Sequence, residues 1–507
     1  MTKHSVVLDC YTVEPSGLGV PPYISTYVRT AYSALRQARP GNDVRYLTID
    51  DVRWSLNGGK PHVAAPHSDP LTYSTTANRD DAIRLLRDAE EVIVIGGDKV
   101  PSVHLHAVNG GLADIARAMS CVRGKRYLLG PMTTFMLSEP AEYAGLFDAS
   151  HTHTITSKDI ALGSRTSAPY GRLRADRDSF AGLVEQMPWT PIAELEMYRG
   201  CTRRNFCDFC NEPGKSPIVA FRDVDDIVEE AGQLYAAGVR HLRLGQQTCF
   251  FSYHNRDVDK IRALLSGIRK ACPDLEVLHI DNADPLAVAA PVGRKIAGLV
   301  AEFCTEGNCA PMGIESFDLV VIERNTLTCT PDVLMRAVQH VNEAGGERGP
   351  GGLPMLLPGL NLIYGMPGET HATHIANLTW LTRIYHAGLM CHRTNVRQVR
   401  AFPGTPLAAQ NGQPLAPSAE HFETWKADID HGWDQPMKER VYPSGLLVPG
   451  LHSYFVNDMG TWWRRLGSYS IQIIEPNTAT PVGTSGDLAI TGHAPRVIFG
   501  QRLAVAA

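Results

Sequence analysis

Apolar and polar positions follow two different periods along the first third of the chain. Helical spacing of apolar residues appears in YISTYVRTAYSALRQAR, DDAIRLLRDA and GGLADIARAM. Between these segments lie short runs rich in β-branched and aliphatic residues, which predict strands: SVVLDCY, DVRYLTID, EEVIVIGG and GKRYLLGP. Strands that alternate with helices indicate a parallel sheet with helices on its faces. Residues 1–165 are therefore expected to form a Rossmann-like α/β domain.

The same alternation resumes near residue 190, after a segment rich in Ser, Thr, Arg and Asp that we expect to link two domains. Six strand-like runs follow, each with a helix-like segment after it except the last: IAELEMY, HLRLG, EVLHID, APMGIES, PGLNLIYG and RTNVRQVRAF. In the first helical segment Ile227, Ala231 and Leu234 share one face. Six strand–helix steps indicate a partial (β/α)6 barrel of the TIM type over residues 190–410.

The periodic pattern weakens after residue 410. Only two short strand-like pieces stand out, SIQIIEP and APRVIFG. We therefore expect residues 411–507 to form a small C-terminal domain.

Charge and hydropathy exclude several classes of protein. The chain of 507 residues has a formal net charge of −5 and is 44% hydrophobic, which gives no reason to expect nucleic acid or anionic lipid as the main partner. No apolar run reaches the roughly 20 residues that span a bilayer, and the N-terminus lacks the features of a signal peptide. A cytoplasmic protein without a membrane partner is expected.

Three of the eleven cysteines are clustered, and the others are dispersed in a way that does not suggest a disulfide framework. Cys201, Cys207 and Cys210 directly follow the first strand of the barrel region, where TIM-type folds place active sites. A structural zinc ion requires four ligands, and the sequence near the three cysteines contains no histidine that could be the fourth. Three thiolates on a four-iron cube leave one iron open for a small molecule. Cysteines without metal, or with zinc, remain the alternative interpretation.

The three cysteines, with aromatic Phe209 before the last one, resemble the cluster loop of the radical SAM superfamily. The commonest spacing there is Cys-x3-Cys-x2-Cys, whereas this chain has the minority spacing Cys-x5-Cys-x2-Cys. Gly245, Gln246 and Gln247 end the second strand, where the family has a Gly-Gly-Glu-like turn for the methionyl amino group. Two of these three residues differ from that turn.

Three further stretches match the family in order and at strand ends. MGIES (312–316) occupies the fourth strand end, and FPGTP (402–406) matches the element after the sixth strand. NLIYGMPGET (361–370) resembles the fifth-strand motif that packs around adenine, which implies cofactor contacts for Asn361, Ile363 and Gly365. The resemblance covers roughly residues 190–410.

The resemblance implies a [4Fe-4S] cluster, S-adenosylmethionine (SAM), reductive cleavage of a carbon–sulfur bond and an electron-donor protein of the flavodoxin or ferredoxin type. A small metabolite or natural-product intermediate is the expected substrate. Glu315 or Asp281 is a candidate to hold the ribose hydroxyls, and each is alternatively a capping or ion-pairing carboxylate. Arg397 and Gln398 are polar positions in the sixth strand; Arg397 is expected to pair with a carboxylate of the ligand or of the protein.

Members of the superfamily with an N-terminal α/β domain often bind cobalamin there. Here Gly96 and Gly97 follow a strand, but the signature that supplies an axial histidine is absent, and His104 and His106 stand in a different context. Cobalamin is therefore a secondary expectation.

Cys249 and Cys309 are the candidates for a further chemical role. Cys249 follows the second strand, while Cys309 precedes the fourth and reaches the barrel mouth only if its loop folds back. Such thiols would suit a thiophilic substrate such as arsenite, or transfer of a methyl or 3-amino-3-carboxypropyl group; buried thiols are the alternative.

Two further classes of function stay open. One is an enzyme that modifies RNA or a peptide, although residues 411–507 hold seven Lys and Arg against nine Asp and Glu. The other is a non-catalytic iron–sulfur or zinc protein.

Overall fold

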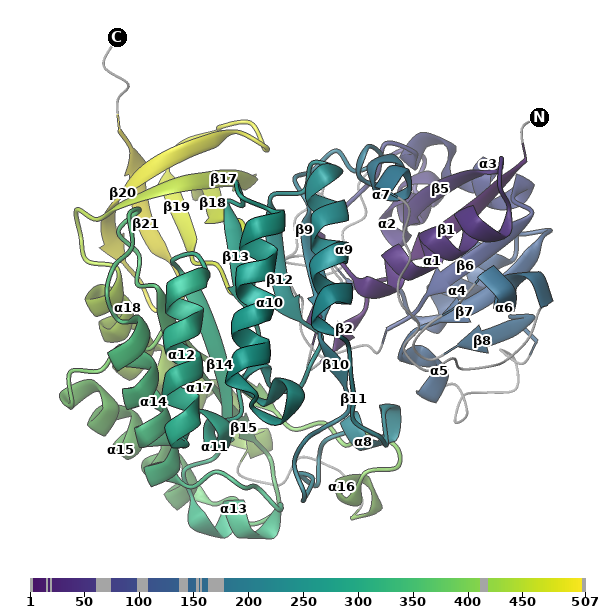
Figure 1. Ribbon diagram of the computed structural model, residues 1–507. Helices are drawn as coiled ribbons and strands as arrows, with labels where there is room; N and C mark the ends of the chain where they lie inside the picture. Colours follow the sequence, from purple (N-terminus) through teal and green to yellow (C-terminus); the bar gives the residue numbers. More distant parts are fainter. Residues whose placement is uncertain are drawn as a thin grey trace. The chain divides into compact units, whose positions relative to one another are not determined.

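The computed structural model describes residues 3–14, 17–18, 21–60, 74–97, 108–135, 145–151, 155, 157–162, 177–410 and 418–503. The chain forms two compact units, each built from several segments (Figure 1). The first unit comprises Met1–Glu196, Arg222–Gln246 and Lys270–Leu275. The second unit comprises Met197–Phe221, Gln247–Arg269 and Glu276–Ala507.

A five-stranded parallel sheet forms the core of the first unit. Its strands, in spatial order, are β5 (Asp43–Thr48), β1 (His4–Asp9), β6 (Glu91–Ile95), β7 (Lys125–Leu129) and β8 (Ala149–His151). Successive residues of a strand point to opposite faces of the sheet, and both are apolar here: Val6 lies in one hydrophobic cluster and Val7 in the other. Both faces of the sheet are therefore apolar. The four strands expected in this region are confirmed.

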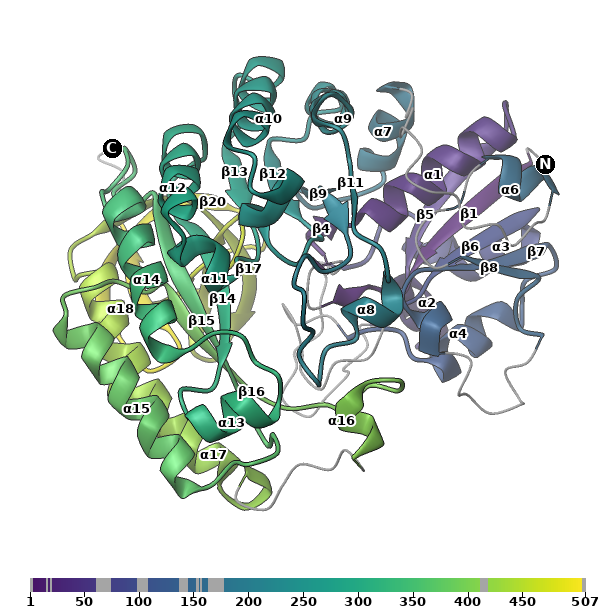
Figure 2. The same ribbon diagram turned by 60° about the horizontal axis from the view of Figure 1, so that its bottom comes forward.

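Helices cover both faces of this sheet (Figure 2). On one face pack α1 (Thr26–Ala38), α6 (Ser157–Leu162) and α7 (Arg177–Val184). On the other pack α2 (Ile49–Leu56), α3 (Ala82–Asp88) and α4 (Leu112–Met119). Three of these helices, α1, α3 and α4, were expected from apolar spacing.

The first unit also holds the beginning of the second strand–helix series. In it β4 (Tyr23–Ile24), β9 (Ile192–Glu196) and β12 (His241–Gly245) pair in parallel. Helix α9 (Val224–Ala236) carries the predicted apolar face, since Ile227, Ala231 and Leu234 are fully buried.

The second unit continues the series with β13 (Val277–Ile280), β14 (Asn308–Glu315), β15 (Leu356–Tyr364) and β16 (Arg393–Gln398). The last three pair in parallel. Their helices are α12 (Pro291–Phe303), α14 (Pro331–Gly345) and α15 (His371–His386), while α10 (Val258–Ala271) contributes to both units. Among the described residues, no helix combines the length and apolar character that crossing a membrane requires.

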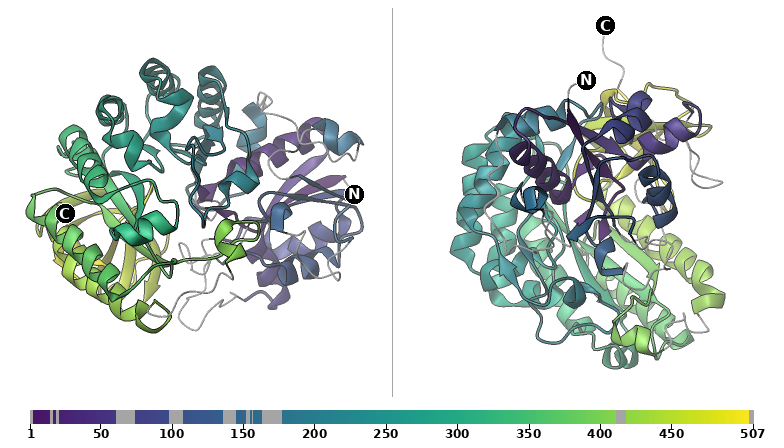
Figure 3. Two further views of the ribbon diagram at one scale, coloured as in Figure 1. Left: turned by 90° about the horizontal axis from the view of Figure 1, so that it is seen from below. Right: turned by 90° about the vertical axis from the view of Figure 1, so that its right-hand side faces the viewer.

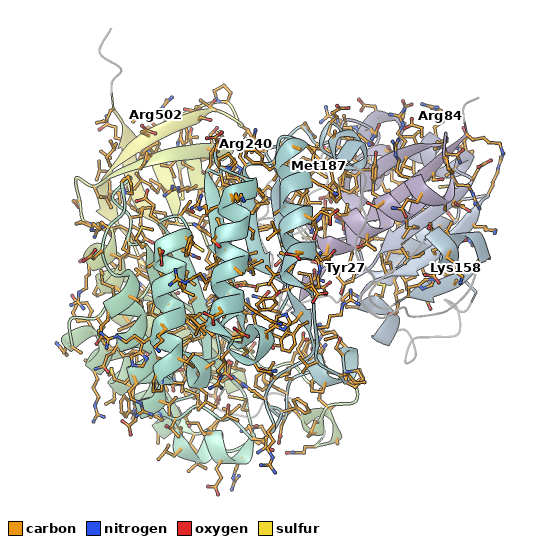
Figure 4. All side chains as sticks on the ribbon, viewed as in Figure 1. Tyr27, Arg84, Lys158, Met187, Arg240 and Arg502 are labelled. Atoms are coloured by element: carbon orange, nitrogen blue, oxygen red, sulfur yellow. The ribbon has the colours of Figure 1, made fainter. Side chains whose placement is uncertain are left out.

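A closed five-stranded barrel forms most of the C-terminal region (Figure 3, yellow). Its order is β17 (Leu447–Asn457), β18 (Gly460–Arg465), β19 (Gln472–Pro476), β21 (Ile498–Arg502) and β20 (Ser485–His493). Arg502, labelled in Figure 4, lies on β21, and its Nε donates to Glu475 of β19 at 2.9 Å. Strands β19 and β21 were expected; the helical stretch before the barrel, α17 (Ser418–Ile429), η5 (Asp430–Asp434) and α18 (Gln435–Val441), was not.

Short elements complete the fold. They are β2 (Val13–Glu14), β3 (Gly17–Leu18), η1 (Arg79–Asp81), α5 (Met132–Phe135), β10 (Tyr198–Arg199), α8 (Glu212–Lys215), β11 (Ala220–Phe221), η4 (Phe250–Asn255), α11 (Pro285–Ala289), α13 (Leu319–Arg324) and α16 (Pro406–Ala409).

Candidate functional site

A two-stranded ribbon closes the loop that carries the three clustered cysteines. Strands β10 and β11 pair antiparallel, with Tyr198 opposite Phe221. Gly200 leaves β10 with φ +84°, and a Cβ atom there would lie 2.9 Å from the carbonyl oxygen of Ile218. Only glycine adopts this conformation without strain. The ribbon therefore fixes both ends of residues 200–219, which we call the cysteine loop.

The three thiols of the cysteine loop are neighbours. The Cys210 N–H donates to the Cys207 carbonyl oxygen at 3.0 Å, and no cysteine of the chain forms a disulfide. Burial raises the pKa of Cys207 to about 11 and that of Cys210 to about 12, and it raises the pKa of Cys201 as well. Without a metal these groups are thiols near neutral pH, so a bound metal would displace their protons.

An apolar wall surrounds Cys207. Residues from α13, from the turns after β15 and β16 and from α16 meet in one hydrophobic cluster, which comprises Val321, Ile322, Leu327, Met366, Val399 and Leu407. Phe209 and Ile363, two predicted cofactor contacts, border this cluster together with Cys210. The wall excludes water from one side of the cysteine loop, which strengthens any electrostatic interaction there.

Arg203 links the cysteine loop to the turn after β13. Its Nε and Nη2 donate to the two carboxylate oxygens of Asp284 at 3.0 and 3.1 Å, and its Nη1 donates to Cys207 Sγ at 3.1 Å. The Asp284 carboxylate also caps α11 by accepting from the Leu286 N–H. Asp284 thus fixes the Arg203 guanidinium through two of its nitrogen atoms.

Cys249 is held by the hydroxyl group of Tyr198. The hydroxyl donates to the Cys249 carbonyl oxygen at 2.7 Å and accepts from the Cys249 N–H at 2.9 Å. The Cys249 Sγ atom accepts from the Asp284 N–H at 3.1 Å. Burial raises the pKa of this thiol to about 11, and the nearby Asp284 charge makes a smaller contribution in the same direction. Cys249 therefore lies beside the carboxylate that holds Arg203.

Glu315 ends β14 at a β-bulge, with its backbone in the left-handed region at φ 63°. Gly313 leaves space for its side chain, since a Cβ atom there would lie 2.1 Å from Glu315 Oε1. The Oε2 atom is buried and has no hydrogen-bond partner among the described residues. Burial raises the pKa of Glu315 to about 7, against the opposing charges of Arg203 and Arg397. Such a strained, unpartnered carboxylate is a candidate ligand contact.

Arg397 lies on β16 in register with Ile363 of β15. With the Asn395 amide oriented so that its oxygen faces Arg397, that oxygen accepts from Nε at 2.9 Å and from Nη2 at 3.0 Å. The surrounding protein and the neighbouring Arg393 lower the pKa of Arg397. Asn361 pairs with Asn395 across the two strands.

A loop of the C-terminal barrel reaches the same strands. Tyr469, between β18 and β19, donates its hydroxyl to Asp281 Oδ1 at 2.8 Å. The Arg393 guanidinium lies 5.0 Å from the centre of its ring. Asp281 is therefore engaged by a tyrosine hydroxyl, a contact that is neither a helix cap nor an ion pair, and Glu315 is the stronger ribose candidate.

The remaining predicted contacts are distributed over both units. Gly245 and Gln246 lie in the first unit, where Glu194 Oε1 would meet a Cβ atom at Gly245 within 2.1 Å and Gln246 has φ 54°. Gln247, in the second unit, is buried. Gly365 has φ 91°, and its N–H donates to Glu369. Gln398 is exposed at the end of β16.

Cys309 does not fit the expected catalytic role. It is the second residue of β14, opposite Leu357, whereas Glu315 ends that strand. The loop before β14 does not fold back, so Cys309 lies at the amino end of the strand, away from the carboxyl ends that carry the site. We therefore do not propose a thiophilic site shared by Cys249 and Cys309.

The cysteine loop fits a four-iron cluster. Among the described residues, no three His, Cys, Asp or Glu side chains are arranged around a single metal ion. A cube takes each thiolate at a different corner, so the three sulfurs need not converge on one point. After burial and other nearby charges, Cys201 contributes to the raised pKa of Cys207, and Cys207 contributes to that of Cys210, so the thiols are near one another. Three thiols in one loop, two of which (Cys207 and Cys210) lie against the apolar wall, are a suitable donor set.

Gly96, the first of the two glycines after β6, is closely packed and leaves no open space beside its Cα atom for cobalamin. A Cβ atom at Gly96 would meet Met132 Sδ at 2.9 Å, and Gly130 stands against the Gly96 carbonyl oxygen. Close packing within the first unit explains both glycines. His104 and His106 lie outside the described residues.

Sequence reasoning missed Arg203, Asp284, Tyr198 and Tyr469. A signal existed only for Arg203, which stands inside the cysteine motif itself. Asp284 and Tyr469 are distant in sequence from the cysteines, and only the fold relates them to the site.

Comparison with known proteins places these features in context. The sequence model described as the radical SAM superfamily matches residues 195–380. An uncharacterised protein of Methanocaldococcus jannaschii is 32% identical to this chain over 99% of this chain and 93% of that protein.

Two solved structures share the fold. The radical SAM methyltransferase TsrM of Kitasatospora setae, bound to tryptophan and a SAM analogue, aligns with a TM-score of 0.52 and 14% identity over 90% of this chain and 79% of that chain. The cobalamin-dependent SAM radical enzyme OxsB, bound to aqua-cobalamin, aligns with a TM-score of 0.53 and 11% identity over 83% of this chain and 62% of that chain. The expected α/β fold class is confirmed.

Proposed function

Because this chain belongs to the radical SAM superfamily, we propose that it is an enzyme that modifies a small molecule carrying an anionic group. The observation that carries the proposal is the convergence of Cys207, Arg203, Glu315 and Arg397. Burial raises the pKa of both Cys207 and Glu315; Arg203 opposes the rise at Cys207, and Arg203 and Arg397 oppose it at Glu315. These groups come from the cysteine loop, β14 and β16, and Cys207 belongs to the apolar wall.

Each part of this arrangement has a proposed task. Cys201, Cys207 and Cys210 would hold the [4Fe-4S] cluster, and Phe209 and Ile363 would pack around the cofactor. When bound, the cluster supplies the electron that cleaves a carbon–sulfur bond of SAM. The unpartnered Glu315 carboxylate would accept hydrogen bonds from the ribose hydroxyls. The apolar wall would keep water away from the reacting atoms.

Arginine side chains are the reason for proposing an anionic substrate. Arg393 and Arg397 lie on the same face of β16, because they are four residues apart in a strand. Among the described residues, neither forms an ion pair, although Asn395 orients Arg397. Two neighbouring guanidinium groups that form no ion pair with a described residue, one partly buried and one exposed, suit a carboxylate or a phosphate.

Anaerobic reconstitution tests the proposal. The protein would be loaded with iron and sulfide, reduced by dithionite or by a flavodoxin, and incubated with SAM. Formation of 5′-deoxyadenosine supports ordinary reductive cleavage. Formation of 5′-methylthioadenosine would instead support transfer of the 3-amino-3-carboxypropyl group. Zinc in place of iron, with no nucleoside product, would contradict the proposal and leave a non-catalytic metal protein.

Methyl transfer is the second candidate. It is favoured by the alignment with the methyltransferase TsrM, which covers 90% of this chain, and the alignment with the cobalamin-dependent enzyme OxsB favours a role for cobalamin. Release of S-adenosylhomocysteine that depends on added cobalamin would support it. Equal rates of product formation with and without added cobalamin would contradict it.

Three further expectations stay predictions. An electron donor of the flavodoxin or ferredoxin type would serve the cluster, and a cytoplasmic location would suit it. Action on RNA or a peptide is a further candidate, although residues 411–507 carry more acidic than basic residues, which does not favour RNA.

A further inference from the structure

The long interval between the first two cysteines places a cation against one of the proposed cluster ligands. Cys201 and Cys207 are separated by five residues, and Arg203 is the second of them. Its Nη1–H donates directly to Cys207 Sγ at 3.1 Å. The shorter spacing that is common in the superfamily has two fewer residues in this interval.

Arg203 is fixed in this position by Asp284. Both oxygens of that carboxylate accept from the guanidinium, at 3.0 and 3.1 Å, in the planar geometry that arginine and carboxylate favour. The exposed fraction of the side chain is 21% for Arg203 and 8% for Asp284. The N–H that points at Cys207 is therefore not free to turn toward solvent.

We propose that Arg203 sets the reduction potential of the cluster, with Asp284 as its positioning residue. This inference rests on the proposed cluster ligands. Reduction adds one negative charge to the cluster, and hydrogen bonds to its sulfurs are among the factors that determine the potential. A guanidinium that donates to a ligand sulfur stabilises the added electron, so the potential rises. The apolar wall beside Cys207 strengthens this effect because it lowers the local polarity.

The test is a redox titration of the reconstituted holoenzyme, followed by the electron paramagnetic resonance of the reduced cluster. Arg203→Gln removes the charge and should disfavour reduction at least tenfold, which is a fall of about 59 mV for a one-electron couple. Arg204→Gln is the matched control, because Arg204 is the exposed neighbour and its loss changes the net charge equally. Its potential should equal that of the wild type.

Two further variants separate charge from structure. Arg203→Lys keeps the charge but loses the separate guanidinium nitrogens that donate to Asp284 and Cys207. Its potential should therefore lie between those of the wild type and Arg203→Gln. Asp284→Asn removes a negative charge but keeps one oxygen that accepts from the guanidinium, so Arg203 stays in place with less compensation and the potential should rise. A fall in Asp284→Asn, or equal potentials in Arg203→Gln and Arg204→Gln, would overturn the inference.

The experiment also distinguishes this inference from the proposed function. A wild-type protein that takes up no four-iron cluster would refute the proposed cluster ligands. A cluster that forms with an unshifted potential would refute the role of Arg203 alone. If Arg203→Gln fails to hold iron, the opposite shifts expected for Arg203→Lys and Asp284→Asn still decide the question.

Discussion

Glu315 combines a left-handed backbone with a buried carboxylate oxygen that has no partner among the described residues. Such a carboxylate binds a ligand hydroxyl without first breaking another hydrogen bond. We therefore expect Glu315→Gln to weaken SAM binding to the reconstituted enzyme about tenfold, the value of one hydrogen bond to a charged group, roughly 1.5 kcal/mol. Equilibrium dialysis with labelled SAM measures this. Glu323→Gln, on the exposed side of α13, should bind SAM as the wild type does, and equal affinities of the two variants would refute the role of Glu315.

Tyr198 has a structural task beside the same site. Its hydroxyl satisfies both backbone groups of Cys249, so Tyr198→Phe leaves a buried N–H without an acceptor. The expected loss is about 1–3 kcal/mol in the free energy of unfolding. Urea unfolding measures it, with Tyr235→Phe as the control. The Tyr235 hydroxyl donates to Asp274 in an exposed position, so its loss should cost less than about 0.5 kcal/mol.

The sequence indicates the site residues that belong to local motifs and misses those that depend on folding. Cys207, Phe209 and Ile363 were expected at one site, and the structure brings these three to one apolar cluster. Asp284 gave no signal, because an aspartate before a proline reads as an ordinary helix cap. Its pairing with Arg203 joins residues 81 positions apart.

At the scale of elements, the β10–β11 ribbon is the part of the fold that determines the shape of the cysteine loop. Gly200→Ala forces an alanine into φ +84° and against the Ile218 carbonyl oxygen, so the ribbon must shift. We expect the iron content after reconstitution to fall at least twofold. Gly214→Ala is the control within the same loop, because it is helical and has open space around it. Full iron content in Gly200→Ala would show that the ribbon does not shape the loop.

Strands and helices with a buried face were predicted well for a physical reason. The strands of the parallel sheets and their covering helices bury continuous apolar surface, which leaves a clear period in the sequence. Helix α17 and strand β17 lack such a period. In β17 the buried positions include Ser453, and the exposed ones include Leu447, so burial does not follow polarity there. The C-terminal barrel was therefore only partly predicted.

At the scale of the whole molecule, the C-terminal barrel contributes to the site of the second unit through one loop. The Ser468 N–H donates to His279 Nδ1 at 3.0 Å, and Tyr469 reaches Asp281 and Arg393. The sequence expectation of an appended domain did not include this contribution. No local pattern relates residues 466–471 to strands almost two hundred positions earlier, and only packing within the unit does so.

His392 joins β16 to this loop, which makes the contact sensitive to acid. Its Nε2–H donates to the Tyr469 carbonyl oxygen and its Nδ1 accepts from the Tyr442 hydroxyl at 2.5 Å, so the neutral ring is fully satisfied. Burial lowers the pKa of His392 from 6.5 to about 4. Because the unfolded chain takes up the proton first, the stabilisation present above pH 6.5 is lost as the pH falls toward 4.

Between pH 7 and pH 5 the second unit should therefore lose about 2 kcal/mol of unfolding free energy through His392 alone. The glutamine of His392→Gln cannot titrate. Between pH 7 and pH 5 the variant should therefore lose about 2 kcal/mol less unfolding free energy than the wild type loses, whatever its stability at pH 7. Urea unfolding at the two pH values measures the difference. His386→Gln, in an exposed position of α15, should retain the wild-type dependence. If His392→Gln and the wild type lose the same amount, the C-terminal barrel is not held to β16 by a neutral histidine.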